Sequence, residues 1–386
     1  MRFLLVILAA LAAASAALAG GGPEGPSLGY GAQVREARPV LFCKAFEARP
    51  EAQRSCLVKQ LVRLVKTTND PATELPRIDR YARSTGNLLA VCHGIMHSVG
   101  IQFAAARKLS LGDLNTVLPR SNDPGCSAGF AHGMIIYLGP QLRQVGSKAA
   151  LVACGKPSTR YQRYSCVHGL GHAYMRLSGE RLAVGLKACS ALGPRNGPDC
   201  AQGAFHDYWI ALGDRPSTRL PWGAGSATQV AYQLCSRYDY VRGCWYRALL
   251  EDHPRPIRSA ADLRALCRGM RGIHHHGCII GGSATSSSNP FSQVRLCSAL
   301  PGPDAVDCVH GLRPAIGPLA DQISLIAGCK SFVASARAGC YRWLGKTLNV
   351  VTNGRFLKSG CGRLTSGAAD CRRGAASYAG PLVTFS

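Results

Sequence analysis

The sequence predicts an all-α protein made of disulfide-stapled helical-hairpin repeats, arranged as an α-solenoid or a closed helical array. Two observations lead to this prediction. Seven times, a cysteine is followed nine to twelve positions later by another, and the first cysteines of successive pairs lie 30 to 46 residues apart. Short helical patterns flank these pairs. A period of about 30 to 45 residues is typical of stacked helical arrays, in which each unit packs on its neighbours.

The 18 cysteines are expected to form nine disulfides. Their number is even, and no C-x2-C spacing favours zinc-thiolate sites instead. Cys92 and Cys126 are paired only by elimination, so a different pairing with Cys43 or Cys56 stays open. The expected bridges are Cys43–Cys56, Cys92–Cys126, Cys154–Cys166, Cys189–Cys200, Cys235–Cys244, Cys267–Cys278, Cys297–Cys308, Cys329–Cys340 and Cys361–Cys371.

Residues 1–19 have the pattern of a secretory signal peptide. Arg2 precedes an apolar run that ends in an Ala-x-Ala cleavage site at Ala17–Ala19. A membrane anchor is the alternative, but an alanine-rich run of about 17 residues is short for a bilayer span. We therefore expect a periplasmic or secreted protein with no transmembrane segment after cleavage. Export agrees with the many cysteines, since disulfides persist outside the reducing cytosol.

The mature chain divides into four expected parts. Residues 20–40 are rich in glycine and proline and predict a flexible lead-in. Residues 41–212 form a histidine-bearing helical domain, and residues 213–225, which include Gly, Pro, Ser and Thr residues, form a linker. Residues 226–386 form the C-terminal disulfide-stapled helical repeats.

Each repeat unit is expected to run helix, loop, helix. A helical pattern ends at the first cysteine, and Ser259 with Asp262 fits a capping box at one such helix start. The second helix is expected to begin at the second cysteine, as at Cys166. The tri-histidine segment 274–276 falls between two paired cysteines and is expected in a solvated loop.

Glycine recurs three residues after the second cysteine. Glycine within a helix costs about 0.5–1 kcal/mol relative to alanine. Its repetition therefore predicts a close approach of neighbouring helix backbones. The glycines in question are Gly129, Gly169, Gly203, Gly281, Gly311 and Gly374.

Short C-x-x-G motifs accompany this period. They occur as CAQGAF at Cys200, as CVHGL at Cys308 and, in looser form, as CYRWLG at Cys340. Together with the paired cysteines, they resemble the cysteine-rich Sel1-like repeat proteins, a branch of the tetratricopeptide-like solenoids, over residues 154–386 only. The resemblance implies an α-solenoid used for binding. It carries no implication for the histidines.

Six histidines repeat in phase with the cysteines. Two pairs have helical i, i+4 spacing, so both rings of a pair share one helix face and can meet one ion. The histidines six residues after Cys126, Cys166 and Cys200 occupy equivalent positions, which stacked units bring side by side. Imidazoles without carboxylates favour zinc or copper over calcium or magnesium. The candidate ligands are His93, His97, His132, His168, His172 and His206.

From Cys244 onward, the positions six residues after the second cysteine of a pair no longer carry histidine. They carry Leu250, Ala284 and Pro314, so the candidate site is confined to the N-terminal half. The alternative is a set of core histidines that are hydrogen-bonded separately. A metal-binding imidazole needs an acceptor for its other nitrogen. The candidates for that role are Asp207, Asp123 and Tyr174.

The formal net charge of +24 favours anionic partners. The 35 arginines and 10 lysines are scattered and are not interleaved with aromatic residues, which disfavours nucleic-acid binding. No nucleophile elbow, P-loop, dinucleotide fingerprint or H-E-x-x-H motif occurs, so catalytic residues stay unassigned.

Two function hypotheses follow. The first is an exported transition-metal-binding protein, which as an enzyme would be a metal-dependent hydrolase or a copper-type oxidoreductase. The second is a non-catalytic solenoid that binds an envelope protein or an anionic envelope polymer.

Overall fold

The protein is helical throughout the part of the chain that its computed structural model describes. It forms sixteen α-helices and one 3-10 helix, and these residues contain no strand. The described residues are 43, 50–67, 75, 78, 86–118, 126–155, 160–213, 227–252, 257–286, 290–312, 329–352, 361, 362, 364 and 366–376. The helices are α4 (Pro50–Thr67), α6 (Gly86–Arg107), η3 (Leu111–Asp113), α7 (Leu114–Val117), α8 (Cys126–Tyr137), α9 (Gly139–Ala153), α10 (Arg160–Leu177), α11 (Leu182–Ser190), α12 (Gly197–Gly213), α13 (Ala227–Cys235), α14 (Val241–Asp252), α15 (Ala260–Leu266), α16 (Gly272–Ala284), α17 (Pro290–Ser298), α18 (Gly302–Gly311), α20 (Ala334–Thr352) and α22 (Ala368–Ala376).

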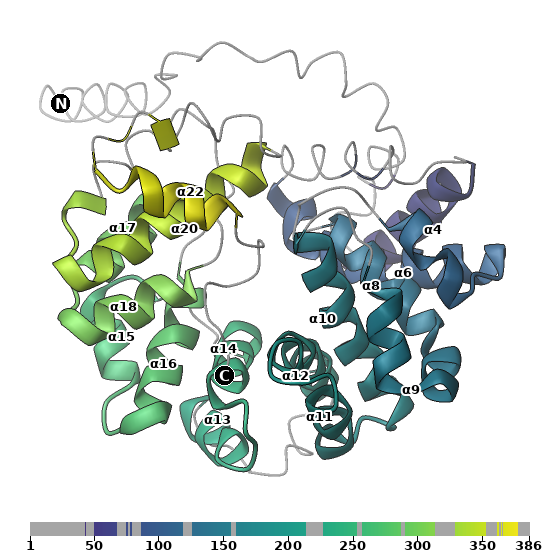
Figure 1. Cartoon of the computed structure of the whole chain (residues 1–386), viewed down its shortest axis with the longest axis horizontal. Helices are drawn as coiled ribbons and strands as arrows, with labels where there is room; N and C mark the ends of the chain where they lie inside the picture. Colours follow the sequence, from purple (N-terminus) through teal and green to yellow (C-terminus); the bar gives the residue numbers. More distant parts are fainter. Residues whose placement is uncertain are drawn as a thin grey trace, which may run out of the picture.

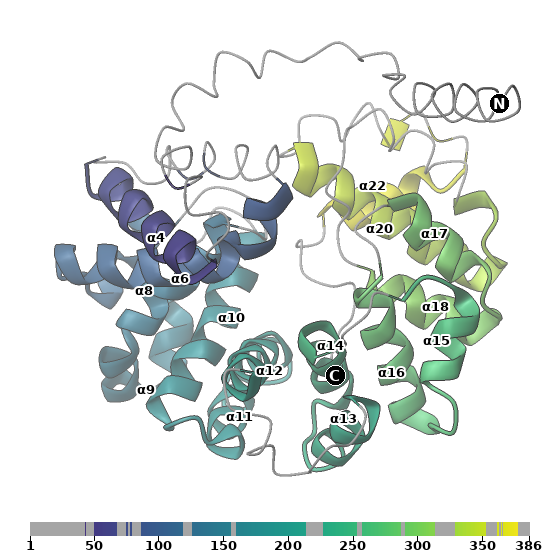
Figure 2. The same cartoon turned by 180° about the vertical axis from the view of Figure 1, so that it is seen from behind.

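The helices follow one another along an arc from α4 to α22 (Figures 1 and 2). Helices α6, α8, α10, α12, α14, α16, α18, α20 and α22 each pack against the next one in this order. The shorter helices α11, α13, α15 and α17 pack between them or beside them, toward the outside of the arc. The six candidate metal ligands lie on α6, α8, α10 and α12, and these four helices are thus consecutive neighbours.

All eighteen cysteines are paired, and all nine expected bridges form. The prediction made by elimination is confirmed, because Cys92 of α6 bonds Cys126 of α8 with a Cα–Cα distance of 5.0 Å. In α11 and α12, Cys189 near the end of one helix bonds Cys200 in the first turn of the next. Nine disulfides indicate an oxidising environment outside the cytoplasm. Within the described ranges, no helix has both the length and the apolar character needed to cross a bilayer.

Several expectations lie outside the described residues. They are the signal peptide at 1–19, the lead-in at 20–40 and, apart from Gly213, the linker at 213–225. Helix α12 extends to Gly213, so the first residue of the expected linker is its last residue.

The second helices begin earlier than expected. Helix α10 starts at Arg160, six residues before Cys166, and α12 starts at Gly197, three residues before Cys200. In α12, Pro198 suits the first turn because backbone N–H groups there have no acceptor within the helix, so the N–H that proline lacks is not needed. Asp199 is favourable beside the positive end of the helix dipole. The capping box is confirmed, since the Ser259 hydroxyl accepts a hydrogen bond from the Asp262 N–H.

The tri-histidine segment is helical, and the expectation of a solvated loop is wrong. His274, His275 and His276 lie in the first turns of α16 and are half-buried. Each ring has a partner, which accounts for the ordered backbone. The indole N–H of Trp245 donates to His274 Nδ1 at 3.1 Å. The two following rings contact carboxylates of α18, His275 with Asp304 at 2.9 Å and His276 with Asp307 at 2.5 Å.

Five of the six recurring glycines lie where helix backbones touch, as predicted, whereas a Cβ on Gly169 would first meet the side chain of Ile135. A Cβ on Gly129 would stand 2.1 Å from the His93 carbonyl oxygen, and a Cβ on Gly203 would stand 1.9 Å from that of His168. Both separations are far shorter than any van der Waals contact. The glycines therefore let α8 pack tightly on α6 and α12 on α10. Similar crowding against a carbonyl oxygen occurs at Gly281, Gly311 and Gly374.

Gly129→Ala is expected to lower the free energy of unfolding by about 2–3 kcal/mol, because the added methyl group forces α6 and α8 apart. Gly94→Ala is the matched control, since Gly94 is also helical and a Cβ there meets nothing within 4 Å. The control should gain about 0.5–1 kcal/mol from helix propensity. Urea unfolding of both variants measures the difference. Equal effects would contradict the close-approach interpretation.

Candidate metal centre

The six predicted histidines lie together in the structure. Helix α6 supplies His93 and His97, and α8 supplies His132. Helix α10 supplies His168 and His172, and α12 supplies His206. The ring centroids of neighbouring members are 4.9 to 5.6 Å apart, as in His97–His172 at 4.9 Å and His93–His206 at 5.6 Å. The repeat phase therefore predicted a real cluster.

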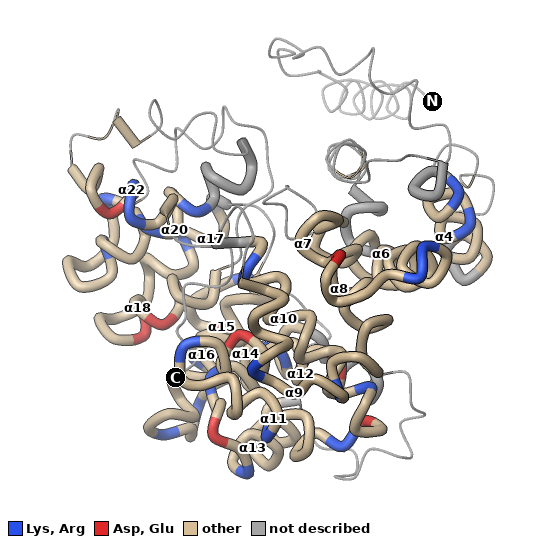
Figure 3. Tube along the Cα trace, turned by 45° about the vertical axis from the view of Figure 1, so that its right-hand side comes forward, with Lys and Arg blue, Asp and Glu red and all other residues tan. Residues whose placement is uncertain are grey.

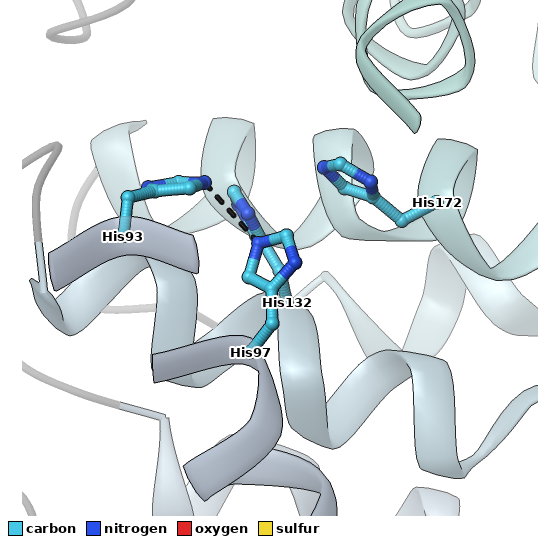
Figure 4. Close-up of side chains that lie close together, drawn as sticks. All are labelled: His93, His97, His132 and His172. Atoms are coloured by element: carbon cyan, nitrogen blue, oxygen red, sulfur yellow. Dashed lines mark hydrogen bonds between the residues drawn. The ribbon is translucent and has the colours of Figure 1, made fainter. Parts of the chain in front are cut away.

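Four of the rings converge from three helices. His93, His97, His132 and His172 each offer a nitrogen, and these atoms all lie within 4.8 Å of one another. Figure 4 shows the four imidazoles pointing toward a common space. The Nε2 atoms of His93 and His97 are 3.2 Å apart. Tetrahedral ligands about 2.0–2.1 Å from one zinc ion stand about 3.4 Å from each other. This pair is thus already close to the spacing of two ligands on one ion.

His172 is held in one orientation by an ion-paired carboxylate. Its Nδ1 lies 3.4 Å from Asp207 Oδ1, and Arg176 Nε lies 3.1 Å from Asp207 Oδ2. A proton on Nδ1 donated to Asp207 leaves the lone pair on Nε2. That Nε2 is buried and has no hydrogen-bond partner among the described residues. Histidine ligands typically show this arrangement, with a carboxylate behind the imidazole and a free nitrogen in front.

His132 shows the same division between its two nitrogens. Its Nε2 lies 3.2 Å from the hydroxyl of Ser165, and its Nδ1 is buried without a partner in the described part of the chain. Leaving a buried polar atom unsatisfied costs about 1–3 kcal/mol. His132 and His172 each carry one such nitrogen, and both residues belong to the four-histidine group. A metal ion bound through these two nitrogens would satisfy both.

A second group of ring nitrogens adjoins the first. His168, His172 and His206 also have their candidate ligand atoms within 4.8 Å of one another. Because His172 Nδ1 faces Asp207, only its Nε2 is available. His172 can therefore serve one ion at a time, in the four-histidine or in the three-histidine group. His168 Nδ1 lies 3.5 Å from the hydroxyl of Tyr164.

Burial keeps three imidazoles of this cluster neutral. It lowers the pKa of His132, His168 and His206 well below the usual value of 6.5. Neighbouring histidines lower each pKa further, and the charge of Arg247 acts in the same direction on His168 and His206. Neutral imidazole is the form that binds metal ions. These rings are therefore ready to bind at neutral pH.

Of the three residues predicted to accept a hydrogen bond from a ligand histidine, one does so. Asp207 supports a histidine, but that histidine is His172 and not the adjacent His206. Tyr174 is buried in the hydrophobic core, and Asp123 lies outside the described residues. Sequence reasoning missed Arg176 and Ser165. Arg176 stands four residues after His172, a helical spacing that could have revealed it.

No known protein family, characterised protein or solved structure matches this chain. The histidine geometry is therefore the basis for assigning a function.

Proposed function

We propose that this protein binds a transition-metal ion, zinc or copper, through His93, His97, His132 and His172. The observation that carries this proposal is the convergence of four histidine side chains from three helices. Two of these residues, His132 and His172, each have a buried ring nitrogen without a hydrogen-bond partner among the described residues. Buried polar nitrogens are rarely left in this state unless a ligand completes them. His168 and His206 extend the site on the side of α12.

The chemistry of the donors favours zinc or copper. Both groups consist of imidazoles alone, and imidazole suits zinc, copper, iron and nickel, whereas calcium and magnesium require oxygen ligands. Four imidazoles complete a tetrahedral shell, as in closed, non-catalytic zinc sites. Binding is therefore the primary activity that we propose for this group.

A catalytic role belongs to the three-histidine group. Three imidazoles leave the fourth position open for water or substrate, which is the arrangement of hydrolytic zinc centres. An ion held by His168, His172 and His206 would support a metal-dependent hydrolase or a copper-type oxidase. Under this proposal, the protein would be an enzyme only if His172 binds an ion together with His168 and His206 and not with the four-histidine group.

The architecture that we propose is a disulfide-stapled array of helical-hairpin repeats, related to the Sel1-like solenoids. The serial packing of α6 through α22 and the regular bridges support this assignment. We further propose export to the periplasm or the medium, in agreement with the signal-like residues 1–19 and the nine disulfides.

The alternative is a non-catalytic solenoid whose basic surface binds an envelope protein or an anionic polymer. Figure 3 shows Lys and Arg spread over many helices and not gathered in one patch. That alternative expects histidines that are buried and bonded separately. The mutual ring contacts of the six histidines favour the metal-binding proposal.

Elemental analysis tests the proposal. The oxidised protein, purified without a His-tag, is expected to carry one equivalent of zinc or copper. His97→Ala/His172→Ala is expected to carry none, because it removes two of the four ligands and the one histidine that both groups share.

His274→Ala/His275→Ala is the matched control, since it removes two half-buried histidines outside the cluster. It should keep the metal. A wild-type protein that stays metal-free after incubation with zinc and with copper(II), followed by desalting, would contradict the proposal. So would equal metal content in the two double variants.

Asp207→Asn is expected to weaken metal binding 10- to 100-fold, because an amide orients the His172 ring less firmly and no longer forms an ion pair with Arg176. Asp239→Asn, at an exposed position, is the control and should bind as the wild type does. Competition with a chromophoric chelator measures both affinities. Identical metal affinities of the two variants would show that Asp207 does not contribute to the site.

A further inference from the structure

A cavity of about 490 Å³ lies among α15, α16 and α18. Helices α15 and α18 both pack against α16, and in Figure 1 the three lie across the arc from α6, α8 and α10. The volume falls within the range of small-molecule sites, about 300–1,000 Å³. None of the six clustered histidines lines this cavity. It is therefore separate from the proposed metal centre.

Two positive charges belong to the lining of the cavity. They are the guanidinium groups of Arg264 in α15 and of Arg268, which follows that helix. The two residues are four positions apart, close to one helical turn, so both can reach the same ligand. Both side chains are exposed, and neither forms a hydrogen bond or an ion pair with another residue of the described chain. Both are thus available to a ligand.

Helix α18 contributes a carboxylate to the same lining. Asp304 Oδ1 lies 2.9 Å from Nε2 of His275 in α16, and both residues line the cavity. The Asp304 side chain is only 17% exposed, so water screens its charge less than that of a surface carboxylate. The ring of His275 is its one partner among the described residues. Since a carboxylate accepts several hydrogen bonds, Oδ2 retains capacity for a ligand.

The charges in the lining do not pair with one another. Arg264, Arg268 and Asp304 share one cavity, yet no ion pair links either arginine to Asp304 in the described part of the chain. A simple anion in the cavity would be repelled by Asp304, and a simple cation would be repelled by the two arginines. A ligand that carries both charges complements both parts of the lining.

Apolar groups complete the lining. Ala261, Ala265 and Met270 border the cavity, and the flexible thioether of methionine adapts to apolar groups of different shapes. The Cys267–Cys278 disulfide ties the end of α15 to α16. Arg268 and Met270 follow Cys267 directly, so this bridge restrains the part of the chain that carries them. A restrained lining loses less entropy when a ligand binds.

We propose that this cavity, here named the zwitterion site, binds a small molecule of the α-amino acid class. Arg264 and Arg268 bind its carboxylate, for which the planar guanidinium group is well suited. Asp304, oriented by His275, accepts hydrogen bonds from its ammonium group, and Met270 contacts its apolar side chain. The site requires no metal and does not depend on the proposed metal-binding function.

Calorimetric titration of the metal-free protein with three matched compounds tests the proposal. L-Leucine carries both charges, 4-methylpentanoate lacks the ammonium group, and 3-methylbutylamine lacks the carboxylate. L-Leucine is expected to bind saturably, and each of the other two compounds to bind about tenfold more weakly or worse, because each loses one charged contact. Titrations with glycine and L-phenylalanine extend the test to a smaller and a larger side chain.

Arg264→Gln/Arg268→Gln is expected to weaken L-leucine binding by about tenfold or more. Both arginines are exposed, so the variant should keep the melting temperature of the wild type. Arg258→Gln/Arg295→Gln is the matched control, because it removes two exposed arginines that do not line the cavity. It should bind L-leucine as the wild type does.

Asp304→Asn distinguishes direct contact from a structural effect. It should bind L-leucine more weakly, because the charge that attracts the ammonium group is lost. It should bind 4-methylpentanoate more tightly, because the charge that repels the carboxylate is lost as well. A substitution that only disturbs α18 would weaken both ligands alike. Asp239→Asn, at an exposed position outside the cavity, should change neither affinity.

Three results would overturn the zwitterion site. They are no saturable binding of L-leucine, glycine or L-phenylalanine, equal L-leucine binding by the two double arginine variants, and equal affinity for the three matched compounds. The last result would indicate an apolar groove that does not read charge. Because the titrations use metal-free protein, a failure of the metal-binding proposal leaves their outcome unchanged.

Discussion

Saturation of the metal-free protein with zinc or copper is expected to raise its free energy of unfolding by about 4 kcal/mol when the free ion is at a thousandfold its Kd. The effect arises because His93, His97, His132 and His172 converge only when α6, α8 and α10 are packed together. The unfolded chain offers no comparable site. Guanidinium unfolding, followed by circular dichroism with the disulfides intact, measures the shift.

The same measurement on His97→Ala/His172→Ala provides the control. This variant should show no metal-dependent stabilisation, and a strong chelator should return the wild type to its metal-free stability. Equal stabilisation of the variant would mean that the ion binds elsewhere, for example at the half-buried histidines 274–276 of α16. If neither zinc nor copper changes the unfolding midpoint of the wild type, the proposal of a metal site in the folded state is contradicted.

Removal of the Cys92–Cys126 bridge is expected to lower the free energy of unfolding by about 4 kcal/mol, because the bridge closes a loop of 34 residues. The bridge also links α6 and α8, which carry three of the four converging histidines. Cys92→Ala/Cys126→Ala should therefore lose metal affinity as well as stability. Thermal or urea unfolding and chelator competition give the two values.

Cys235→Ala/Cys244→Ala is the matched comparison. Its loop has only 9 residues, so the expected loss is about 2.5 kcal/mol, and the bridge joins α13 and α14, away from the four-histidine group. Metal affinity should be kept in this variant. Loss of affinity in both variants, or in neither, would show that the bridge between α6 and α8 has no specific role in the site.

The disulfide framework was predictable from the chain because most bridges are local. Two cysteines separated by a short loop at the same place in every unit have few other partners. The pairing of Cys92 with Cys126 was less certain, since 34 residues separate them. The glycine contacts were also predictable, because glycine in a helix interior is unfavourable unless another backbone needs the space.

The histidine cluster was predictable from phase, but its internal chemistry was not. Spacing places His172 and His206 at equivalent positions of consecutive units. It does not show that Asp207 reaches back to His172, because that contact depends on how α10 and α12 are rotated against each other. Spacing also does not distinguish the Nδ1 and Nε2 atoms of a ring. The choice between them decides which ion each histidine can bind.

The histidines of α16 lay beyond sequence reasoning for a different reason. Local patterns describe neighbours in the chain, whereas the partners of His275 and His276, Asp304 and Asp307, belong to the next helical hairpin.

The bridge between Cys92 and Cys126 has a consequence for when the proposed metal ion would bind. Three converging histidines lie on the two helices that this bridge joins. A reduced chain in the cytosol would hold those helices together less firmly and would compete poorly for cytosolic metal. The ion would then be taken from the supply of the compartment where the cysteines are oxidised. The redox state of the cysteines would thus determine where and when the ion binds, and therefore which metal is available to bind.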